Sequence, residues 1–391
     1  VMEDQRIAVV GGGVFGAAGA LELRRRGHRV QLLDPGPLPH PDASSTNISK
    51  VIRMDYGDDE FTMALMEQAI KGWHAWNATW DETLYHEVGF LLLSSKPLAE
   101  GTYEGDSLRT LLQRGHHPER LDAQAITARY PQWSEAGFVD GYFNPEAGWA
   151  ESGRVVARLL ALCEQEGVEL SPGQPVTEIL REGGRVSGVR TPAGDLLSDW
   201  VVLAAGAWSP GLLPALRDKI WPVAQSVIHY RVVNTEAFRP PGFVTWAADI
   251  AETGWYGFPA LEDGTLKVAN HGPGRRIPPG HGAEVEPEDR ARFRAFLREK
   301  LPAASDAPQV HTRVCFYSDS WDGDFYIDKV PDHDGLVVAT GGSGHGFKFA
   351  PVLGGLIADA LEGVENANLT RYSWRQPGEV RTEQARYASS G

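Results

Sequence analysis

The sequence predicts an α/β (α+β) fold, in which a Rossmann-like dinucleotide-binding domain carries an inserted domain built on a mixed or antiparallel β-sheet. Three observations lead to this prediction. The chain opens with a strand, a glycine-rich turn and a helix; a strand with a glycine turn lies near its middle; and a strand, glycine loop and helix lie near its end. Strand-rich sequence separates the second pattern from the third. A single nucleotide-binding domain in several pieces accounts for this order.

The first element is a βαβ unit within residues 6–34. Gly11, Gly13 and Gly16 directly follow an apolar strand and open an amphipathic helix. Such a turn lets the backbone approach a pyrophosphate, whose charge meets the helix N-terminus. Asp34 ends the second strand, where its carboxylate can accept the ribose 2′-hydroxyl and disfavours the 2′-phosphate of NADP. The turn alone does not separate FAD from NAD.

The remaining elements follow in order along the chain. Residues 58–76 have the period of an amphipathic helix, with acidic residues in the first turn. Residues 86–149, rich in Gly, Pro and aromatic side chains, are expected to be irregular. Further predictions are a helix leading to a strand in 152–170, a hairpin and buried strand in 184–210, strands in 216–320, and a strand, glycine loop and helix in 335–363.

These elements suggest where the domains divide. We assign residues 1–85, 150–215 and 320–391 to the nucleotide-binding domain, because they carry the glycine turns. Residues 86–149 and 216–319 would form the inserted substrate-binding domain.

Composition excludes several classes of partner. The chain has 37 Lys and Arg against 52 Asp and Glu, a net charge of −15, which repels nucleic acid and anionic lipid. Its longest apolar stretches are strand-sized, so we expect no membrane span. Two cysteines make no disulfide scaffold, and a reducing cytoplasm is the expected location. No histidine or cysteine cluster has the spacing of a metal site.

Five sequence blocks together suggest a family. They are "GGGVFG" (11–16), "SSTNISKVIRMDYG" (44–57), "GWYGFPALEDGTLKVANH" (254–271), "VCFYSDSWDGDFYIDKVP" (314–331) and "GGSGHGFKF" (341–349). In this order and spacing, the chain resembles the flavoprotein amine oxidases of the D-amino-acid-oxidase superfamily, in particular the monomeric sarcosine oxidase and N-methyl amino acid oxidase group. The resemblance covers nearly the whole chain.

The resemblance implies a monomeric FAD-dependent oxidase whose substrate is a small secondary amine with a carboxylate. A hydride equivalent would pass from the carbon beside nitrogen to flavin N5, and the imine product would hydrolyse. O2 would then be reduced to H2O2.

It also implies which residues contact FAD. A cysteine at the place of Cys315 is joined through its sulfur to the 8-methyl position of the flavin in that group, and a thiolate is the soft nucleophile that this bond needs. The alternative for a free cysteine is a small buried hydrophobe, which fits Cys163 on the apolar stripe of its helix. The implied FAD contacts are Gly11, Gly13, Val14, Phe15, Gly16, Asp34, Ser44, Ser45, Ser49, Lys50, Val176, Ala205, Gly206, Trp208, Cys315, Gly342, Gly344, His345, Gly346 and Lys348.

The resemblance assigns the substrate site to five residues. Arg53 and Lys348 match the pair that holds the substrate carboxylate, and a planar guanidinium fork beside an ammonium suits that task. Tyr256 and Tyr317 match aromatic residues of the pocket wall, with ordinary strand packing as the alternative. His271 matches a pocket histidine that tunes or orients the substrate.

Lys267 matches the lysine that promotes reaction of the reduced flavin with oxygen. A positive charge there would stabilise developing superoxide. From the residues alone, "LEDGTLKV" is also typical of a hairpin that exposes its lysine.

Lys50 departs from the sarcosine-type pattern, in which arginine is usual. Fructosyl-amino-acid oxidases of the same superfamily carry lysine there, so oxidation of an N-fructosyl amino acid is an alternative. Oxidation of a primary or cyclic amino acid, a dehydrogenase with another electron acceptor, and a non-catalytic flavoprotein also stay open, because fold alone does not choose among them.

Overall fold

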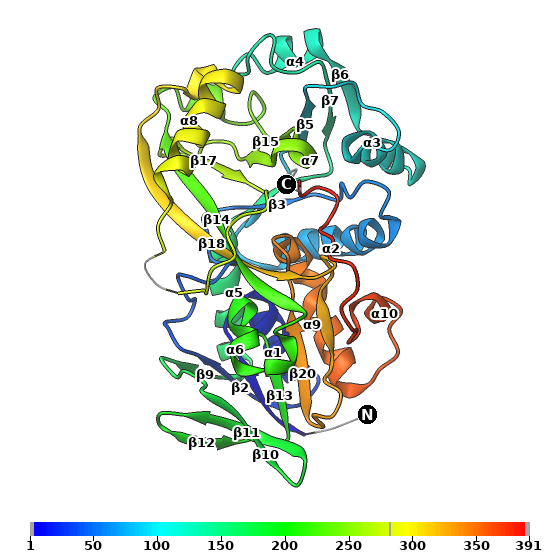
Figure 1. Ribbon diagram of the computed structural model, residues 1–391, viewed down its shortest axis with the longest axis vertical. Coiled ribbons are helices and arrows are strands. Elements are labelled where there is room, and N and C mark those ends of the chain that lie inside the picture. Colours follow the sequence, from blue (N-terminus) through cyan, green and yellow to red (C-terminus); the bar gives the residue numbers. More distant parts are fainter. Residues whose placement is uncertain (1–3, 281–282, 388–391) are drawn as a thin grey trace.

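Two large sheets, one toward each end of the molecule, organise the fold (Figure 1). The structure is a computed structural model that describes residues 4–280 and 283–387. Within these residues, no helix is both long and apolar enough to cross a membrane.

The six-stranded sheet has the order β19-β20-β13-β1-β2-β9. Its pairs are parallel except that of β19 with β20. The central parallel strands β1, β13 and β20 are almost wholly apolar because both faces of the sheet are covered there. The strands are β1 (Arg6–Val10), β2 (Arg29–Asp34), β9 (Glu169–Pro172), β13 (Trp200–Leu203), β19 (Tyr326–Lys329) and β20 (Leu336–Thr340).

Helices cover one face of this sheet and a small sheet covers the other. Helix α1 (Val14–Arg25) packs between α5 (Ser152–Gln165) and α9 (Ala350–Glu362), which lie far apart in the sequence. On the opposite face, Val186 and Val189 pack against Ala8 and Val10. They belong to the antiparallel sheet of β10 (Glu178–Glu182), β11 (Arg185–Thr191) and β12 (Gly194–Leu197).

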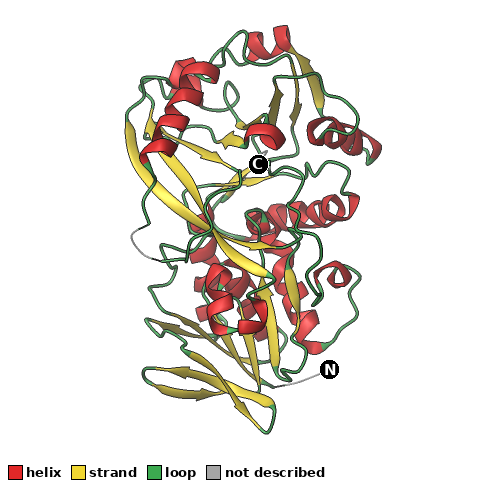
Figure 2. Ribbon diagram, in the orientation of Figure 1, coloured by secondary structure: helices red, strands yellow, loops and turns green. Residues whose placement is uncertain are grey.

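The eight-stranded sheet has the order β18-β14-β17-β16-β15-β5-β7-β6. Its pairs are antiparallel except that of β15 with β5. Strands β14 and β18 run as a long pair toward the helices of the six-stranded sheet (Figure 2). The strands are β5 (Phe90–Ser94), β6 (Glu119–Asp122), β7 (Asp140–Asn144), β14 (Ile220–Arg231), β15 (Thr245–Ala248), β16 (Trp255–Gly257), β17 (Thr265–Asn270) and β18 (Gln309–Ser320).

The prediction that residues 86–149 are irregular is wrong, because the structure has strands and helices there. These residues form strands β5, β6, β7 and β8 (Gly148–Ala150) and helices α3 (Tyr103–Gln113) and α4 (Ala123–Arg129). The run "FLLLS" of β5 is buried on both faces and therefore lacks the polar alternation that marks a strand. Both helices begin at a polar cap, since Thr102 and Asp122 accept hydrogen bonds from Gly105 N and Ala125 N. The expected strand-rich segment likewise contains helix α8 (Pro287–Lys300).

A second small sheet lies between the two large ones (Figure 1). It pairs β8 with β3 (Lys50–Ile52) on one side and β4 (Tyr85–His86) on the other. Helix α2 (Glu60–Thr79) begins where the Asp59 side chain accepts from Thr62 N. Three short α-helices, α6 (Ser209–Leu212), α7 (Ile250–Thr253) and α10 (Leu369–Tyr372), and several 3₁₀ turns complete the described structure. Among these turns is η5 (Gly346–Phe349).

Candidate active site

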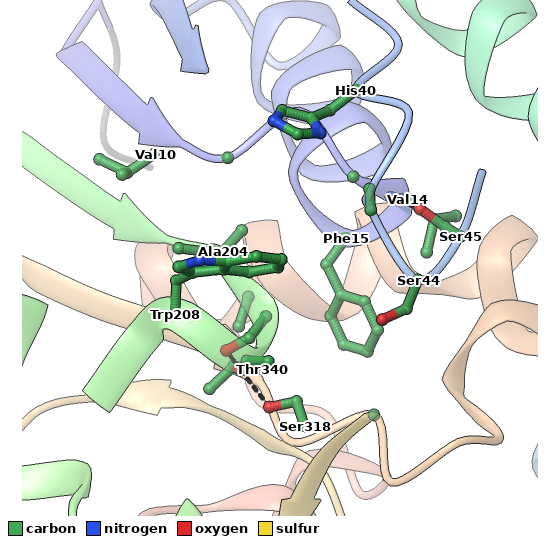
Figure 3. A pocket seen from close by; sticks show the side chains of 18 of the residues that line it. Val10, Val14, Phe15, His40, Ser44, Ser45, Ala204, Trp208, Ser318 and Thr340 are labelled. Carbon is green, nitrogen blue, oxygen red and sulfur yellow. Dashed lines mark hydrogen bonds between the residues drawn. The ribbon is translucent and has the colours of Figure 1, made fainter. Parts of the chain in front are cut away.

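A cavity of about 510 Å³ opens at the carboxyl ends of strands β1, β2, β13 and β20. A ligand that binds at this edge of an open α/β sheet meets the turns that follow the strands. Phe15, Ser44 and Trp208 lie around the cavity, and Ser318 and Thr340 share a hydrogen bond of 3.1 Å on its wall (Figure 3).

The turn after β1 is closed too tightly for larger residues. Gly11 has a φ of +107°, and a Cβ atom there would lie 2.6 Å from Ala204 O on the neighbouring strand. Gly12 N donates a hydrogen bond of 2.8 Å to Asp34 Oδ2, which fixes the carboxylate at the cavity wall. The N-terminus of α1 follows, and Val14 N donates to Ser45 Oγ. A cavity of this size with a glycine turn, a helix N-terminus and an acid fits a dinucleotide.

Most residues expected to contact FAD line this cavity, but five do not. Gly16 lies beneath the turn, where a Cβ atom would meet Gly11 O at 1.8 Å. Ser49 and Cys315 are buried beside the cavity, and His345 and Lys348 line a second one. The expected residues on the wall are Gly11, Gly13, Val14, Phe15, Asp34, Ser44, Ser45, Lys50, Val176, Ala205, Gly206, Trp208, Gly342, Gly344 and Gly346. Among those that the sequence did not single out are His40, Ala204, Ser318, Thr340 and Phe347.

The second cavity, of about 60 Å³, shares part of its wall with the first. Lys50, Tyr317, Gly344 and Phe347 border both cavities. The φ of Gly344 is +79°, and a Cβ atom there would lie 2.3 Å from the Tyr317 ring, so only glycine lets the loop close on that ring. The remaining lining includes the predicted substrate residues Arg53, Tyr256, His271 and Lys348.

Arg53 is held firmly at this smaller cavity. Its side chain is buried, and Nη1 donates a hydrogen bond of 2.5 Å to Tyr103 Oη and another to Asp55 O. Tyr103 Oη in turn donates to Asp55 O. Although burial opposes the charge, the surrounding hydroxyls and carboxylates raise the pKa of Arg53, so it stays cationic.

Lys348 begins a chain of hydrogen bonds. Its Nζ donates to Tyr56 Oη at 3.0 Å, and Tyr56 Oη lies 3.0 Å from His345 Nδ1. Because His345 Nε2 faces the carbonyl oxygen of Gly323, Nε2 carries the proton and Nδ1 accepts from Tyr56. Burial, reinforced by the nearby Arg53, lowers the pKa of Lys348 to about 7. Its charge therefore depends on pH near neutrality.

His271 is paired with a residue that sequence reasoning missed. Its Nε2 is hydrogen-bonded to Glu383 Oε1, and Glu383 belongs to the segment after α10. Burial lowers the pKa of His271, which therefore stays neutral and donates to the carboxylate. Burial opposes the charge of Glu383, but the hydrogen bond from His271 and the nearby Lys348 help to hold its pKa well below the usual range. No motif marks this position, since a glutamate in a polar tail is typical of a solvated residue.

The two cysteines have opposite environments. Cys163 is buried in α5 and burial raises its pKa to about 12, as expected of an inert core residue. Cys315 is also buried, but the positive charges of Lys50 and Arg313 outweigh the effect of burial and lower its pKa. The thiol of Cys315 is therefore the more reactive one.

Lys267 is not the exposed hairpin lysine that its local sequence allowed. It is 1% exposed, its Nζ donates to Ser49 O, and it lies 4.5 Å from the centre of the Phe258 ring. Burial and then Lys50 lower its pKa well below the usual range. In the protein without a bound cofactor, the surroundings of Lys267 therefore disfavour the positive charge that a role in oxygen activation requires.

Comparison with known proteins agrees with this geometry. The sequence model of the FAD dependent oxidoreductase family matches residues 6–360. N-methyl-L-tryptophan oxidase from Salmonella arizonae is 31% identical over 376 residues, which cover 94% of this chain and 97% of that protein. The enzyme of the same name from Citrobacter koseri is 29% identical and covers 91% and 94%.

Solved structures of fungal enzymes are similar in fold. Fructosamine oxidase (Amadoriase II) from Aspergillus fumigatus, in complex with FSA, has a TM-score of 0.86 and 25% identity, covering 100% of this chain and 95% of that one. An Amadoriase I mutant from the same organism has a TM-score of 0.82 and 26% identity, covering 96% and 90%.

Proposed function

The chain belongs to the FAD dependent oxidoreductase family, and from this premise we propose that it oxidises the secondary amine of an N-substituted amino acid, with O2 reduced to H2O2. FAD would bind in the larger cavity and the amino acid in the smaller one. The relatives named N-methyl-L-tryptophan oxidase support an N-methyl amino acid as the substrate class. The domain division, monomeric state and cytoplasmic location expected from the sequence belong to the same proposal.

The observation that carries this proposal is the wall shared by the two cavities. A substrate carboxylate held by Arg53 and Lys348 places the rest of the molecule beside Tyr317 and Gly344, which also border the larger cavity. Binding at one end thereby orients the carbon beside nitrogen toward the cofactor.

The chain's own residues prepare the reaction. FAD, when bound, supplies the two-electron acceptor and passes the electrons on to O2. Arg53 and Lys348 fix the carboxylate, and the half-buried ring of Tyr256 and the buried ring of Tyr317 exclude water from the amine. The turn from Gly11 and the carboxylate of Asp34 would hold the nucleotide. We propose that the Cys315 thiolate, stabilised by Lys50, would tie the flavin covalently to β18. Its sulfur would replace one hydrogen of the 8-methyl group; that hydrogen leaves as a proton, and the two electrons released would pass through the flavin to O2, giving H2O2.

A fructosyl amino acid is the second candidate substrate. Lys50 and the fold shared with Amadoriase II favour it. The smaller cavity, at about 60 Å³, favours a compact substrate, because a cavity needs roughly 10–15 Å³ for each water-sized group. N-methylglycine therefore fits this volume better than a sugar adduct does.

A substrate panel tests the proposal. We would measure peroxide release by the FAD-loaded protein with N-methylglycine, N-methyl-L-tryptophan, fructosyl-glycine, glycine and pipecolate, with Arg53→Met as the control for the carboxylate site. We expect N-methyl amino acids to be turned over and Arg53→Met to lose at least a hundredfold in kcat/KM. Turnover of fructosyl-glycine alone would favour the second candidate, and turnover of none would overturn both. Flavin reduction by substrate without peroxide would favour the dehydrogenase.

A further inference from the structure

The C-terminal segment, residues 380–387, is built into the rim of the substrate cavity. In Figure 1 it runs from α10 back toward the region between the two large sheets. Arg381 N donates a hydrogen bond of 2.7 Å to Trp321 O. Arg386 is buried and forms an ion pair with the buried Asp319. The segment is therefore anchored on both sides of Glu383.

Glycines make room for this segment. A Cβ atom on Gly323 would lie 2.9 Å from Glu383 N, and one on Gly272 would lie 2.4 Å from the Tyr387 ring. Such close approaches mark a fitted contact, because a side chain at either glycine would displace the segment.

The Glu383 side chain reaches from this segment into the substrate cavity, and only 8% of it is exposed. One of its carboxylate oxygens, Oε1, accepts a hydrogen bond from His271 Nε2. Oε2 has no hydrogen-bond partner in the part of the chain that the structure describes, and His345 Nδ1 lies 3.8 Å away. A buried carboxylate oxygen without a partner is unfavourable unless a ligand supplies the donor.

We propose that Glu383 is a specificity-determining residue that binds the substrate nitrogen, with Oε2 accepting its N–H. This inference rests on the proposed function and deepens it. In this arrangement, the cations Arg53 and Lys348 bind the substrate carboxylate, and the anion Glu383 binds the substrate amine. Such a cavity should bind a zwitterionic amino acid more tightly than a carboxylate that has no nitrogen.

A purely structural role for Glu383, in which it only anchors His271, gives a different expectation. Loss of that anchor would weaken every ligand of the cavity together. Loss of an amine-binding anion weakens the amino acid but leaves a simple carboxylate unaffected, or strengthens it because a like charge is removed.

The test compares two ligands of the FAD-loaded protein that differ only at one position. N-methylglycine and butyrate are isosteric, with NH in one and CH2 in the other. The dissociation constant of N-methylglycine comes from the saturation of anaerobic flavin reduction, and that of butyrate from its change of the flavin spectrum. The variant is Glu383→Gln, and the matched control is Glu379→Gln, an exposed glutamate on the same stretch of chain.

We expect Glu383→Gln to weaken N-methylglycine about tenfold or more while butyrate binds as tightly or more tightly. A parallel loss for both ligands, or no change for either, would overturn the inference. Because the variant could fold poorly, the wild type is a second test: butyrate should bind at least tenfold more weakly than N-methylglycine, and equal affinities would also overturn the inference. Turnover of N-methyl amino acids by the wild type tests only the proposed function, whereas the comparison of the two dissociation constants tests the role of Glu383.

Discussion

The side-chain nitrogen of Lys50 lies 3.9 Å from the sulfur of Cys315, next to the wall that the two cavities share. This contact gives a physical reason for a reactive thiol at a buried position of β18. It also gives Lys50, the departure from the sarcosine-type pattern, a role in the chemistry of the cofactor site.

Removing the Lys50 charge should make Cys315 less reactive. In Lys50→Met, the pKa of the Cys315 thiol should rise by roughly one unit or more, because a neighbouring cation lowers a thiol pKa by this order. The measurement is the rate of alkylation of Cys315 against pH in the cofactor-free protein. Lys71→Met, at an exposed site, is the control. An alkylation midpoint that does not move would refute the role of Lys50.

The hydroxyl of Tyr103 should matter for substrate affinity. Tyr103→Phe removes an acceptor of Arg53 and a donor to Asp55 O, so the guanidinium loses part of its orientation. We expect KM to rise roughly tenfold with little change in kcat, since a hydrogen bond to a charged group contributes about 1.5–3 kcal/mol. Tyr130→Phe is the matched control, because its buried hydroxyl has no partner among the described residues. Equal effects of the two variants would contradict this assignment.

Lys348 should make carboxylate binding depend on pH near 7. The pKa of Lys348 is lowered to about 7, so the free enzyme loses this positive charge as pH rises above that value. Affinity for butyrate should be constant below pH 7 and should fall above it. His271, His345 and Glu383 have pKa values below their usual ranges and do not change charge in this window.

Lys348→Arg provides the control for that pH dependence. A guanidinium stays protonated throughout, so the dependence above pH 7 should disappear. A fall in affinity that persists in the arginine variant would assign it to another group.

Lys267 should affect the reaction with oxygen more than the reaction with substrate. In Lys267→Met, we expect oxidation of the reduced enzyme by O2 to slow about a hundredfold. The negative charge of a reduced flavin nearby would restore the positive charge of Lys267, and the variant removes that charge-stabilising group. Anaerobic reduction by substrate should remain within a few-fold of the wild type. Stopped-flow measurement of the two half-reactions separates these effects. If oxidation by O2 is unchanged, Lys267 does not activate oxygen.

The sequence predicted those parts of the fold that depend on local patterns. The glycines after β1 and the acid ending β2 predicted the nucleotide turn, because both are needed within one βαβ unit. The segment 86–149 was misjudged because its β5 is buried on both faces and its helix α4 has only 7 residues. In such segments, tertiary burial rather than periodicity decides the structure.

The predicted site residues came from five separate blocks, and their assembly depended on the resemblance. Arg53 and Lys348 meet at one cavity although β3 and η5 lie near opposite ends of the chain. Glu383 escaped prediction because it lies in a segment without regular structure. Its role depends on anchors such as Arg386 with Asp319, which are contacts across the fold that no local pattern encodes.

The measurement that tests the account most directly is anaerobic addition of an N-methyl amino acid to the FAD-loaded protein. We predict that the yellow flavin colour bleaches, and that admission of O2 restores it with one peroxide formed for each substrate consumed. If N-methyl amino acids leave the flavin oxidised in the absence of oxygen, the protein is not an oxidase of secondary amino acids and the central claim fails.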